Sequence, residues 1–311
     1  MFQKVILILC FSMCIITACD SGKPELKIGY LQIADDPGLN SAKEGFIRAL
    51  TDSGFVDGEN IKIIDNNANG DLSMIISMLQ SLKSQKVNMV VTNGTPCMVS
   101  AAQIITDIPI VFTVSFSPEQ VGLKTTPENL HGVFDPFDTE SFVSMVMKCM
   151  PSLKTVGLPF NNSEPNAEYS ANKIIQSFEK VGVQVVTTSV TSANDILIAG
   201  QYLTTKWVDA LVVGADNTVN LGLNALAKIA GETKTPLFVT EPFQAKKGAA
   251  VGLGVNYEQW GYLSGVKAVH LLKNGRVSPK IEAITELKLY INEEASKTQG
   301  LTIPQSIRDK Y

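Results

Sequence analysis

The fold is decided by residues 26–50, which read LKIGYLQIADDPGLNSAKEGFIRAL. The first six residues are mostly apolar, as in a buried strand. A polar loop with proline and glycine follows, and Ser41 and Glu44 then form the capping-box pattern that begins a helix. Beyond them, apolar residues recur at the spacing of one helix face. A strand, a polar loop and a helix in this order begin a βαβ unit, which predicts a parallel sheet.

The same alternation continues along the chain and falls into two series. Further strands are expected at 61–64, 89–92, 110–114, 155–158, 184–188, 210–213, 237–240, 251–255 and 287–291. Helical patterns lie between them, and Asp135-Pro136 separates the two series. The predicted fold class is therefore α/β, with two doubly wound parallel-sheet lobes.

Composition argues against nucleic acid as a partner. The chain has 311 residues, enough for two domains, and 18% of them are charged, with a formal net charge of −4. Its lysines and arginines are scattered and form no basic stripe of the kind that binds nucleic acid. After the N-terminal segment, no apolar stretch is long enough to cross a membrane.

The N-terminus predicts export. Lys4 precedes an apolar run at 5–18, which is shorter than the about 20 residues that span a bilayer but typical of a signal peptide. The run ends in Ile-Thr-Ala and Cys19, which resembles a bacterial lipobox. We expect a signal peptide at 1–18, lipidation of Cys19 and a polar tether at 19–25, with an ordinary secretory signal as the alternative. The protein would then lie on the outer face of the cytoplasmic membrane, in a periplasm or at a cell surface.

Motifs for catalysis and metal binding are missing from the sequence. It contains no nucleophile elbow, no zinc-type spacing and no P-loop. The two histidines, His131 and His270, have the surroundings of structural residues. Cys97 begins a predicted helix but has no base beside it, and we expect it and Cys149 to be free thiols, with a disulfide between them as the alternative. We therefore expect no enzyme, no cofactor and no metal.

Polar residues collect where the predicted strands end. In open parallel sheets, ligands bind beyond the carboxyl ends of the strands, near helix N-termini. Six polar loops occupy these positions, so two facing lobes would bring them to one cleft; turn formation and helix capping are the alternative role for each loop. The candidate ligand-binding residues are Gln32, Asp36, Thr95, Ser115, Phe116, Ser117, Phe160, Asn161, Ser163, Asp216, Asn217, Thr218 and Glu241.

Several ordered segments carry a resemblance to a known family. They are 28–40, Thr95-Pro96, 107–113, the N-N-S-E-P-N at 161–166, the D-N-T-V at 216–219, and 248–261. With these segments the mature chain resembles the ABC-transporter substrate-binding proteins of the tryptophan/tyrosine-uptake lipoprotein type. The resemblance implies a type I periplasmic-binding fold whose lobes close over a ligand, with three crossovers near 133–136, 241–244 and 283–287. One lobe would comprise 26–134 with 245–282, and the other 135–244 with 283–311.

The same resemblance implies a ligand. In the characterised branch of the family the ligand is an aromatic amino acid, whose ammonium we expect at Asp216 first and at Glu241 second. Its carboxylate is expected near helix N-termini, with the hydroxyls of Thr95, Ser115 and Thr218. Its ring is expected against Phe116 or Phe160. The chain departs from the family where T-D-P is replaced by Phe116-Ser117-Pro118, so a ligand other than an amino acid is the alternative.

The function predicted from these features is that of a lipid-anchored solute-binding protein. It would act as a monomer, bind a small molecule by lobe closure, and deliver it to an ABC permease with its ATPase. A ligand-sensing subunit of a membrane receptor or kinase would have the same fold and remains an alternative. A secreted hydrolase is a third reading, which the missing catalytic motifs disfavour.

Overall fold

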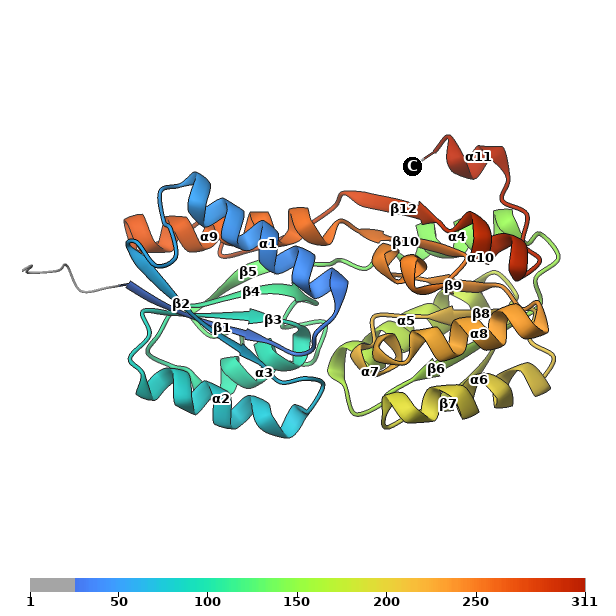
Figure 1. Ribbon diagram of the computed structural model, residues 1–311, viewed down its shortest axis with the longest axis horizontal. Helices are drawn as coiled ribbons and strands as arrows, with labels where there is room; N and C mark the ends of the chain where they lie inside the picture. The colour runs from blue at the N-terminus through green and yellow to red at the C-terminus, as the bar shows by residue number, and fades with distance from the viewer. Residues whose placement is uncertain (1–25, 311) are drawn as a thin grey trace, which may run out of the picture.

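The computed structural model describes residues 26–310 and shows two α/β lobes side by side (Figure 1). Each lobe is built around one six-stranded sheet, so the predicted fold class is confirmed. Within the described residues, no helix has both the length and the apolar character needed to cross a membrane. The expected signal peptide, tether and lipidated Cys19 lie outside the described residues.

The first lobe contains the strands at the start of the chain. Its sheet has the order β11-β5-β4-β3-β1-β2, and all neighbouring strands are parallel. The strands are β1 (Leu26–Gln32), β2 (Ile61–Asn67), β3 (Met89–Asn93), β4 (Ile110–Ser115), β5 (Leu130–Phe134) and β11 (Ile281–Ala283). Two helix pairs cover the sheet: α1 (Pro37–Asp52) with α9 (Tyr257–Asn274), and α2 (Leu72–Ser84) with α3 (Thr95–Ile104).

The second lobe repeats this plan. Its sheet has the order β12-β10-β9-β8-β6-β7, and only β12 is antiparallel to its neighbour. The strands are β6 (Thr155–Phe160), β7 (Gln184–Ser189), β8 (Ala210–Val213), β9 (Leu237–Val239), β10 (Val251–Val255) and β12 (Leu287–Ile291). The helices are α4 (Thr139–Cys149), α5 (Pro165–Lys180), α6 (Ile196–Thr205), α7 (Asn217–Leu221), α8 (Leu223–Thr233), α10 (Glu293–Thr298) and α11 (Gln305–Arg308), with short 3₁₀ turns η1 (Ala193–Asp195) and η2 (Pro242–Lys247).

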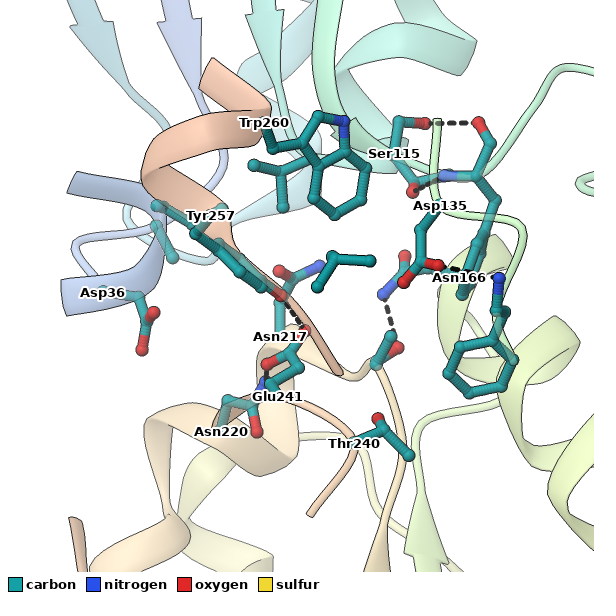
Figure 2. A pocket seen from close by; sticks show the side chains of 18 of the residues that line it. Asp36, Ser115, Asp135, Asn166, Asn217, Asn220, Thr240, Glu241, Tyr257 and Trp260 are labelled. Carbon is teal, nitrogen blue, oxygen red and sulfur yellow. Dashed lines mark hydrogen bonds between the residues drawn. The ribbon is translucent and has the colours of Figure 1, made fainter. Parts of the chain in front are cut away.

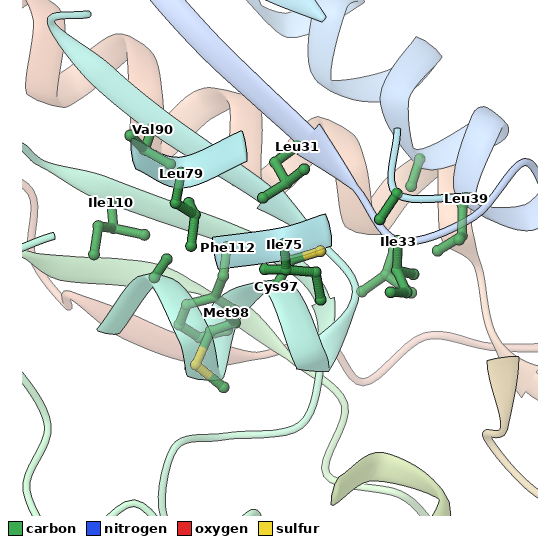
Figure 3. Close-up of a cluster of buried hydrophobic side chains, with 14 of the residues drawn as sticks. Leu31, Ile33, Leu39, Ile75, Leu79, Val90, Cys97, Met98, Ile110 and Phe112 are labelled. Atoms are coloured by element: carbon green, nitrogen blue, oxygen red, sulfur yellow. The ribbon is translucent and has the colours of Figure 1, made fainter. Parts of the chain in front are cut away.

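Apolar side chains fill the space between each sheet and its helices. β3 and β4 are buried along their whole length because helices cover both faces of the sheet. Figure 3 shows one core of the first lobe, where Ile75 and Leu79 of α2 meet Phe112 of β4. Cys97 lies in this core, and both it and Cys149 are free thiols, as expected.

The structure corrects one expected lobe boundary. Residues 245–282 were expected in the first lobe, but β10 belongs to the second sheet, where it pairs with β9 and β12. Glycines allow this close packing, because a Cβ on Gly254 would lie 1.9 Å from the carbonyl oxygen of Thr240. The chain therefore crosses back to the first lobe at Asn256, between β10 and α9. The other two crossings follow β5 and β11.

Candidate functional site

A cavity lies between the lobes, at the carboxyl ends of the strands of both sheets (Figure 2). It contains about 640 Å³ of space free of protein atoms, including its opening to solvent. The position is the one expected for ligands of open parallel sheets. Loops after β1, β3 and β4 contribute from one lobe, and loops after β8 and β9 from the other.

Direct contacts hold the two lobes closed around this cavity. The Lys247 ammonium of η2 lies 2.6 Å from a carboxylate oxygen of Asp36, which caps α1. The Gln244 side chain donates to the same oxygen at 3.1 Å. Elsewhere along the interface, Gln120 of the first lobe donates to the hydroxyl of Tyr169 on α5 at 2.8 Å. The structure therefore shows the closed arrangement of the lobes.

The backbone around the cavity is strained at two lining residues. Val114 and Phe137 have φ angles of 46° and 61°, a left-handed conformation that non-glycine residues rarely adopt. At Val114 the register of β4 against β5 shifts, so the strand bulges immediately before Ser115. Such strain and bulges often occur next to binding sites, where they redirect a side chain.

Aromatic side chains form part of the wall. Tyr257 and Trp260, one helical turn apart at the start of α9, pack edge to face with ring centroids 5.6 Å apart. The Trp260 indole donates to the carbonyl oxygen of Val133 at 2.7 Å, which fixes the ring against β5. Phe116 and Phe137 form a second edge-to-face pair, 5.2 Å apart. These rings offer apolar surface on two sides of the cavity.

Asp135 supplies a partly buried carboxylate at the first crossing between the lobes. One of its oxygens accepts a hydrogen bond from the backbone N–H of Phe137 at 2.7 Å. Within residues 26–310, no cation forms an ion pair with it. Burial, with a smaller contribution from the nearby charge of Asp138, raises the pKa of Asp135 to about 7. A positively charged ligand group would stabilise its ionised form.

Glu241 supplies a second carboxylate, on the opposite side of the cavity (Figure 2). It accepts hydrogen bonds from the Tyr257 hydroxyl and the Asn220 amide, and a longer one from Gln244. Among the described residues, Glu241 likewise has no ion-pair partner. Burial raises its pKa to about 7, and the charge of Asp36 contributes in the same direction.

Two buried asparagine side chains add further hydrogen-bond acceptors beside these carboxylates. Asn166 donates its side-chain nitrogen to the carbonyl oxygen of Ala215 at 2.9 Å, and Asn220 donates its own to Glu241. The oxygen of each amide is thereby fixed as an acceptor, and neither has a hydrogen-bond partner. The cavity residues within 26–310 include no Lys, Arg or His. The site is therefore rich in acceptors and suited to a ligand that brings donors and positive charge.

A second pair of carboxylates, Glu164 and Asp216, lies behind the cavity wall. Glu164 accepts from the backbone N–H groups of Asn217 and Thr218 at 3.2 and 3.0 Å, and from both of their side chains. Asp216 caps α7 by accepting from Val219 N–H at 2.9 Å, and it also accepts from the N–H of Asn161 at 2.6 Å. Burial and the neighbouring charge of Glu164 raise the pKa of Asp216. This cluster ties β6, α5 and α7 together.

The structure brings six of the thirteen predicted ligand-binding residues to the cavity. These six are Asp36, Thr95, Ser115, Phe116, Asn217 and Glu241. Of the other seven, Asn161, Ser163, Asp216 and Thr218 belong to the hydrogen-bonded loops around α7, and Phe160 packs against the core of the second lobe. Gln32 bonds to Asn40 and Asn93 beneath the first loop, and Ser117 forms a turn with Gln120.

Several cavity residues were not anticipated. The ones with the clearest chemical role are Asp135, Asn166, Asn220, Tyr257 and Trp260. Tyr257 and Trp260 carry a signal that could have found them, since their three-residue spacing places them on one helix face just after a strand. Asp135 has no such signal, because an Asp-Pro pair between two domains is equally typical of a connecting turn.

Comparisons with known proteins show the family of the chain. A family model described as ABC transporter substrate binding protein matches residues 27–310. A protein named tyrosine-binding protein from Clostridioides difficile (strain R20291) is 30% identical, over 93% of this chain and 85% of that protein. A solved structure described as an ABC domain in complex with L-Trp from Streptococcus pneumonia is 26% identical, with a TM-score of 0.85 over 92% of this chain and 98% of the other.

A third comparison concerns the lobe arrangement. A substrate-binding protein with adhesive properties from Clostridium difficile, solved in a ligand-free, open form, is 31% identical over 90% of this chain and 96% of that one. Its TM-score is only 0.67, although its sequence is more similar than that of the L-Trp complex. A rotation of one lobe relative to the other lowers the TM-score of the whole chain without changing the structure of either lobe. The lower score therefore agrees with the closed lobes seen here.

Proposed function

The chain belongs to the family of ABC transporter substrate-binding proteins and has a type I periplasmic-binding fold, and from this premise we propose that it binds an aromatic amino acid for an ABC importer. As a member of a solute-binding family, it is a binding protein and not an enzyme. One observation carries the ligand assignment: the closed cavity combines two carboxylates that lack a cation with an aromatic wall. An ammonium group and a ring satisfy both features.

The head group of an amino acid finds complementary partners at one end of the cavity. Asp135 and the free oxygen of Asn166 are acceptors for the ammonium. Thr95 begins α3, whose first N–H groups and positive dipole end favour a carboxylate. The hydroxyls of Thr95 and Ser115 lie at the same edge of the sheet, because β3 and β4 are neighbours. A zwitterion is therefore recognised without an arginine.

The aromatic assignment rests on the walls and on the relatives. Tyr257 and Trp260 present ring surface that can pack edge to face on a ligand ring, which adds about 0.5–1.5 kcal/mol to the burial of its area. The similar proteins are named for tyrosine or were solved with L-Trp. Tyrosine, tryptophan and phenylalanine are the ligands to compare first.

The binding assignment is tested by a thermal-shift screen of the purified protein against the twenty amino acids. A ligand that binds only the folded state stabilises it by RT ln(1 + [L]/Kd), about 2.7 kcal/mol at one hundred times Kd. We expect the largest shifts with aromatic amino acids and none with aspartate or glutamate. A flat screen, or a shift only with acidic ligands, would contradict the assignment.

Delivery requires that the protein be held beside its permease. We propose that it is exported, that Cys19 is lipidated at the outer face of the cytoplasmic membrane, and that the closed monomer docks on the permease of an importer with its ATPase. Membrane fractionation tests the anchor: Cys19→Ala should release the exported protein into the soluble fraction. If this variant stays with the membrane, the anchor lies elsewhere.

A further inference from the structure

Resting on the proposed function, we infer that Tyr169 is a positioning residue for ligand binding: it holds Phe116, a cavity-wall residue from the other lobe, in place when the lobes close. Tyr169 itself is not among the residues that line the cavity. Phe116 follows β4 of the first lobe, whereas Tyr169 lies on α5 of the second (Figure 1). The pair therefore joins the wall of the ligand site to the contact between the lobes.

Phe116 extends from its own lobe into the other. Its side chain is 3% exposed and belongs to the apolar core of the second lobe, together with Phe137. Burial of a phenylalanine side chain stabilises the arrangement that buries it. Separation of the lobes would withdraw this ring from the core and expose it. Because Phe116 also lines the cavity, one side chain serves both the ligand site and the closed arrangement.

Tyr169 fixes Phe116 in two ways. Their ring centroids are 4.7 Å apart with an interplanar angle of 59°, a closer contact than the 5.2 Å between Phe116 and Phe137. The Tyr169 hydroxyl also accepts a hydrogen bond from the Gln120 side chain at 2.8 Å. Gln120 in turn accepts from the N–H of Ser117, at 2.8 Å. Tyr169 is thus tied both to the ring of Phe116 and to the loop that carries this ring.

The helix α5 connects this contact to the ligand site. Asn166, whose amide oxygen has no hydrogen-bond partner, lines the cavity one helical turn before Tyr169. α5 also packs against α3 of the first lobe. Closure therefore brings Asn166 and Phe116 to the cavity in one movement, and Tyr169 joins the two. Phe116 stands in the segment where the chain departs from the T-D-P of its family, so this contact belongs to the chain's own residues.

The position of Tyr169 predicts which rate a substitution changes. A ligand enters while the lobes are apart, when Tyr169 and Phe116 do not touch, so association should not depend on Tyr169. Release requires the lobes to separate, which breaks the contact. Tyr169→Leu should therefore speed dissociation by about five- to tenfold, the size expected for the loss of one aromatic pair. A merely structural role in α5 would instead lower the free energy of unfolding and leave dissociation unchanged.

The test is stopped-flow fluorescence of the purified protein with L-tyrosine, because Trp260 in the cavity wall reports on occupancy. Tyr169→Phe keeps the ring contact and should release the ligand more slowly than Tyr169→Leu. Tyr202→Leu, which removes a tyrosine 45% exposed on α6 of the same lobe, is the matched control and should change neither rate. Urea denaturation of each variant measures stability separately.

A variant in the first lobe keeps the test independent of α5. Gln120→Ala removes the hydrogen bond to Tyr169 and should speed dissociation by about two- to fivefold, the size of one neutral hydrogen bond. If Tyr169→Leu does not fold, this variant decides. An unchanged dissociation rate in it would then overturn the inference.

The double variant Phe116→Leu/Tyr169→Leu tests whether Tyr169 acts through Phe116. We expect Tyr169→Leu to add little to the dissociation rate of Phe116→Leu, because the contact is already lost. Its full effect in that background, or no effect on dissociation in the single variant, overturns the inference while the proposed function stands. If the unmodified protein binds no aromatic amino acid, the proposed function fails, and the inference that rests on it fails as well.

Discussion

Two pairs of carboxylates, one buried and one partly buried, occupy neighbouring parts of the molecule and differ in their hydrogen bonds. Glu164 and Asp216, behind the cavity wall, accept from backbone N–H groups at two or more positions each. Asp135, in the cavity, accepts from one N–H, and Glu241 accepts from side chains only. No cation pairs with any of the four within residues 26–310. The kind of donor, rigid backbone N–H groups for the first pair and mostly mobile side chains for the second, is what separates the two pairs.

This difference teaches how to distinguish a scaffold from a site. Backbone donors fixed by β6, α5 and α7 satisfy the first pair in the empty protein, so those carboxylates stabilise the second lobe. Asp135 of the second pair has one backbone donor, and Glu241 has side-chain donors only, which can rearrange when a ligand binds. Burial and negative charge alone do not identify a binding carboxylate; the kind of hydrogen-bond donor around it, backbone or side chain, has to be considered as well.

The largest effect is expected from removing a scaffold carboxylate. Glu164→Ala leaves the N–H groups of Asn217 and Thr218 without their acceptor, at about 1–3 kcal/mol for each buried group. We expect the free energy of unfolding to fall by about 3 kcal/mol, measured by urea denaturation. Loss of less than 1 kcal/mol would mean that the first pair is not a scaffold.

The next effect should appear in binding and spare stability. Asp135→Asn removes the charge that faces the ligand ammonium but keeps an oxygen acceptor for Phe137 N–H. We expect binding of the aromatic amino acid to weaken by about 1.5–3 kcal/mol, the range for hydrogen bonds to charged groups. The unfolding free energy of the empty protein should not fall. Calorimetry and urea denaturation on the same preparation measure both quantities.

pH sharpens the comparison because the pKa of both Asp135 and Glu241 is raised to about 7 from ordinary values near 4. Between these values the folded state binds protons that the unfolded state has released, so stability of the empty protein falls as pH rises from about 4 to 7. We expect the free energy of unfolding to fall by about 1–2 kcal/mol per pH unit. It should fall less steeply in the double variant Asp135→Asn/Glu241→Gln. Asp216, whose pKa is also raised, should leave a residual slope.

Ligand affinity should follow the opposite direction. An ammonium favours ionised carboxylates, so binding should strengthen between pH 5 and pH 8, until the ligand ammonium itself begins to lose its proton. Affinity that is independent of pH across this range, measured by calorimetry, would show that neither Asp135 nor Glu241 meets a positive charge. A stability slope that is the same in the double variant Asp135→Asn/Glu241→Gln as in the unmodified protein would contradict the raised pKa of both groups.

The smallest effect is expected at the contact between the lobes. Lys247→Met removes the ion pair between Lys247 and Asp36. The lysine side chain is 22% exposed, so the ion pair contributes about 1 kcal/mol or less. We expect affinity to weaken by up to about fivefold, and small-angle scattering to show a more open empty protein. Lys180→Met, which breaks an exposed pair with Glu140 inside the second lobe, is the matched control. Equal effects of both variants would exclude a role in closure.

Sequence patterns predicted the architecture more fully than the site. Alternating strands and helices specify two α/β lobes, but the assignment of β10 depends on which sheet edge Gly252 and Gly254 can approach, which periodicity does not encode. Helix caps and ligand sites both use Asp, Asn and Thr at strand ends, so Asp216 and Asp36 looked alike in sequence. Only the three-dimensional structure shows that Asp216 lies behind the wall and Asp36 lies at the cavity.

The central claim is that the cavity pair, Asp135 and Glu241, binds the ligand and the pair behind the wall, Glu164 and Asp216, does not. Titration of L-tyrosine into Asp135→Asn and Asp216→Asn, side by side in one calorimeter at pH 7.5, tests it most directly. Both substitutions replace a carboxyl group by an amide and keep one side-chain oxygen. The account predicts at least tenfold weaker binding in Asp135→Asn and unmodified affinity in Asp216→Asn. Weakened binding in Asp216→Asn, with Asp135→Asn unaffected, would contradict it.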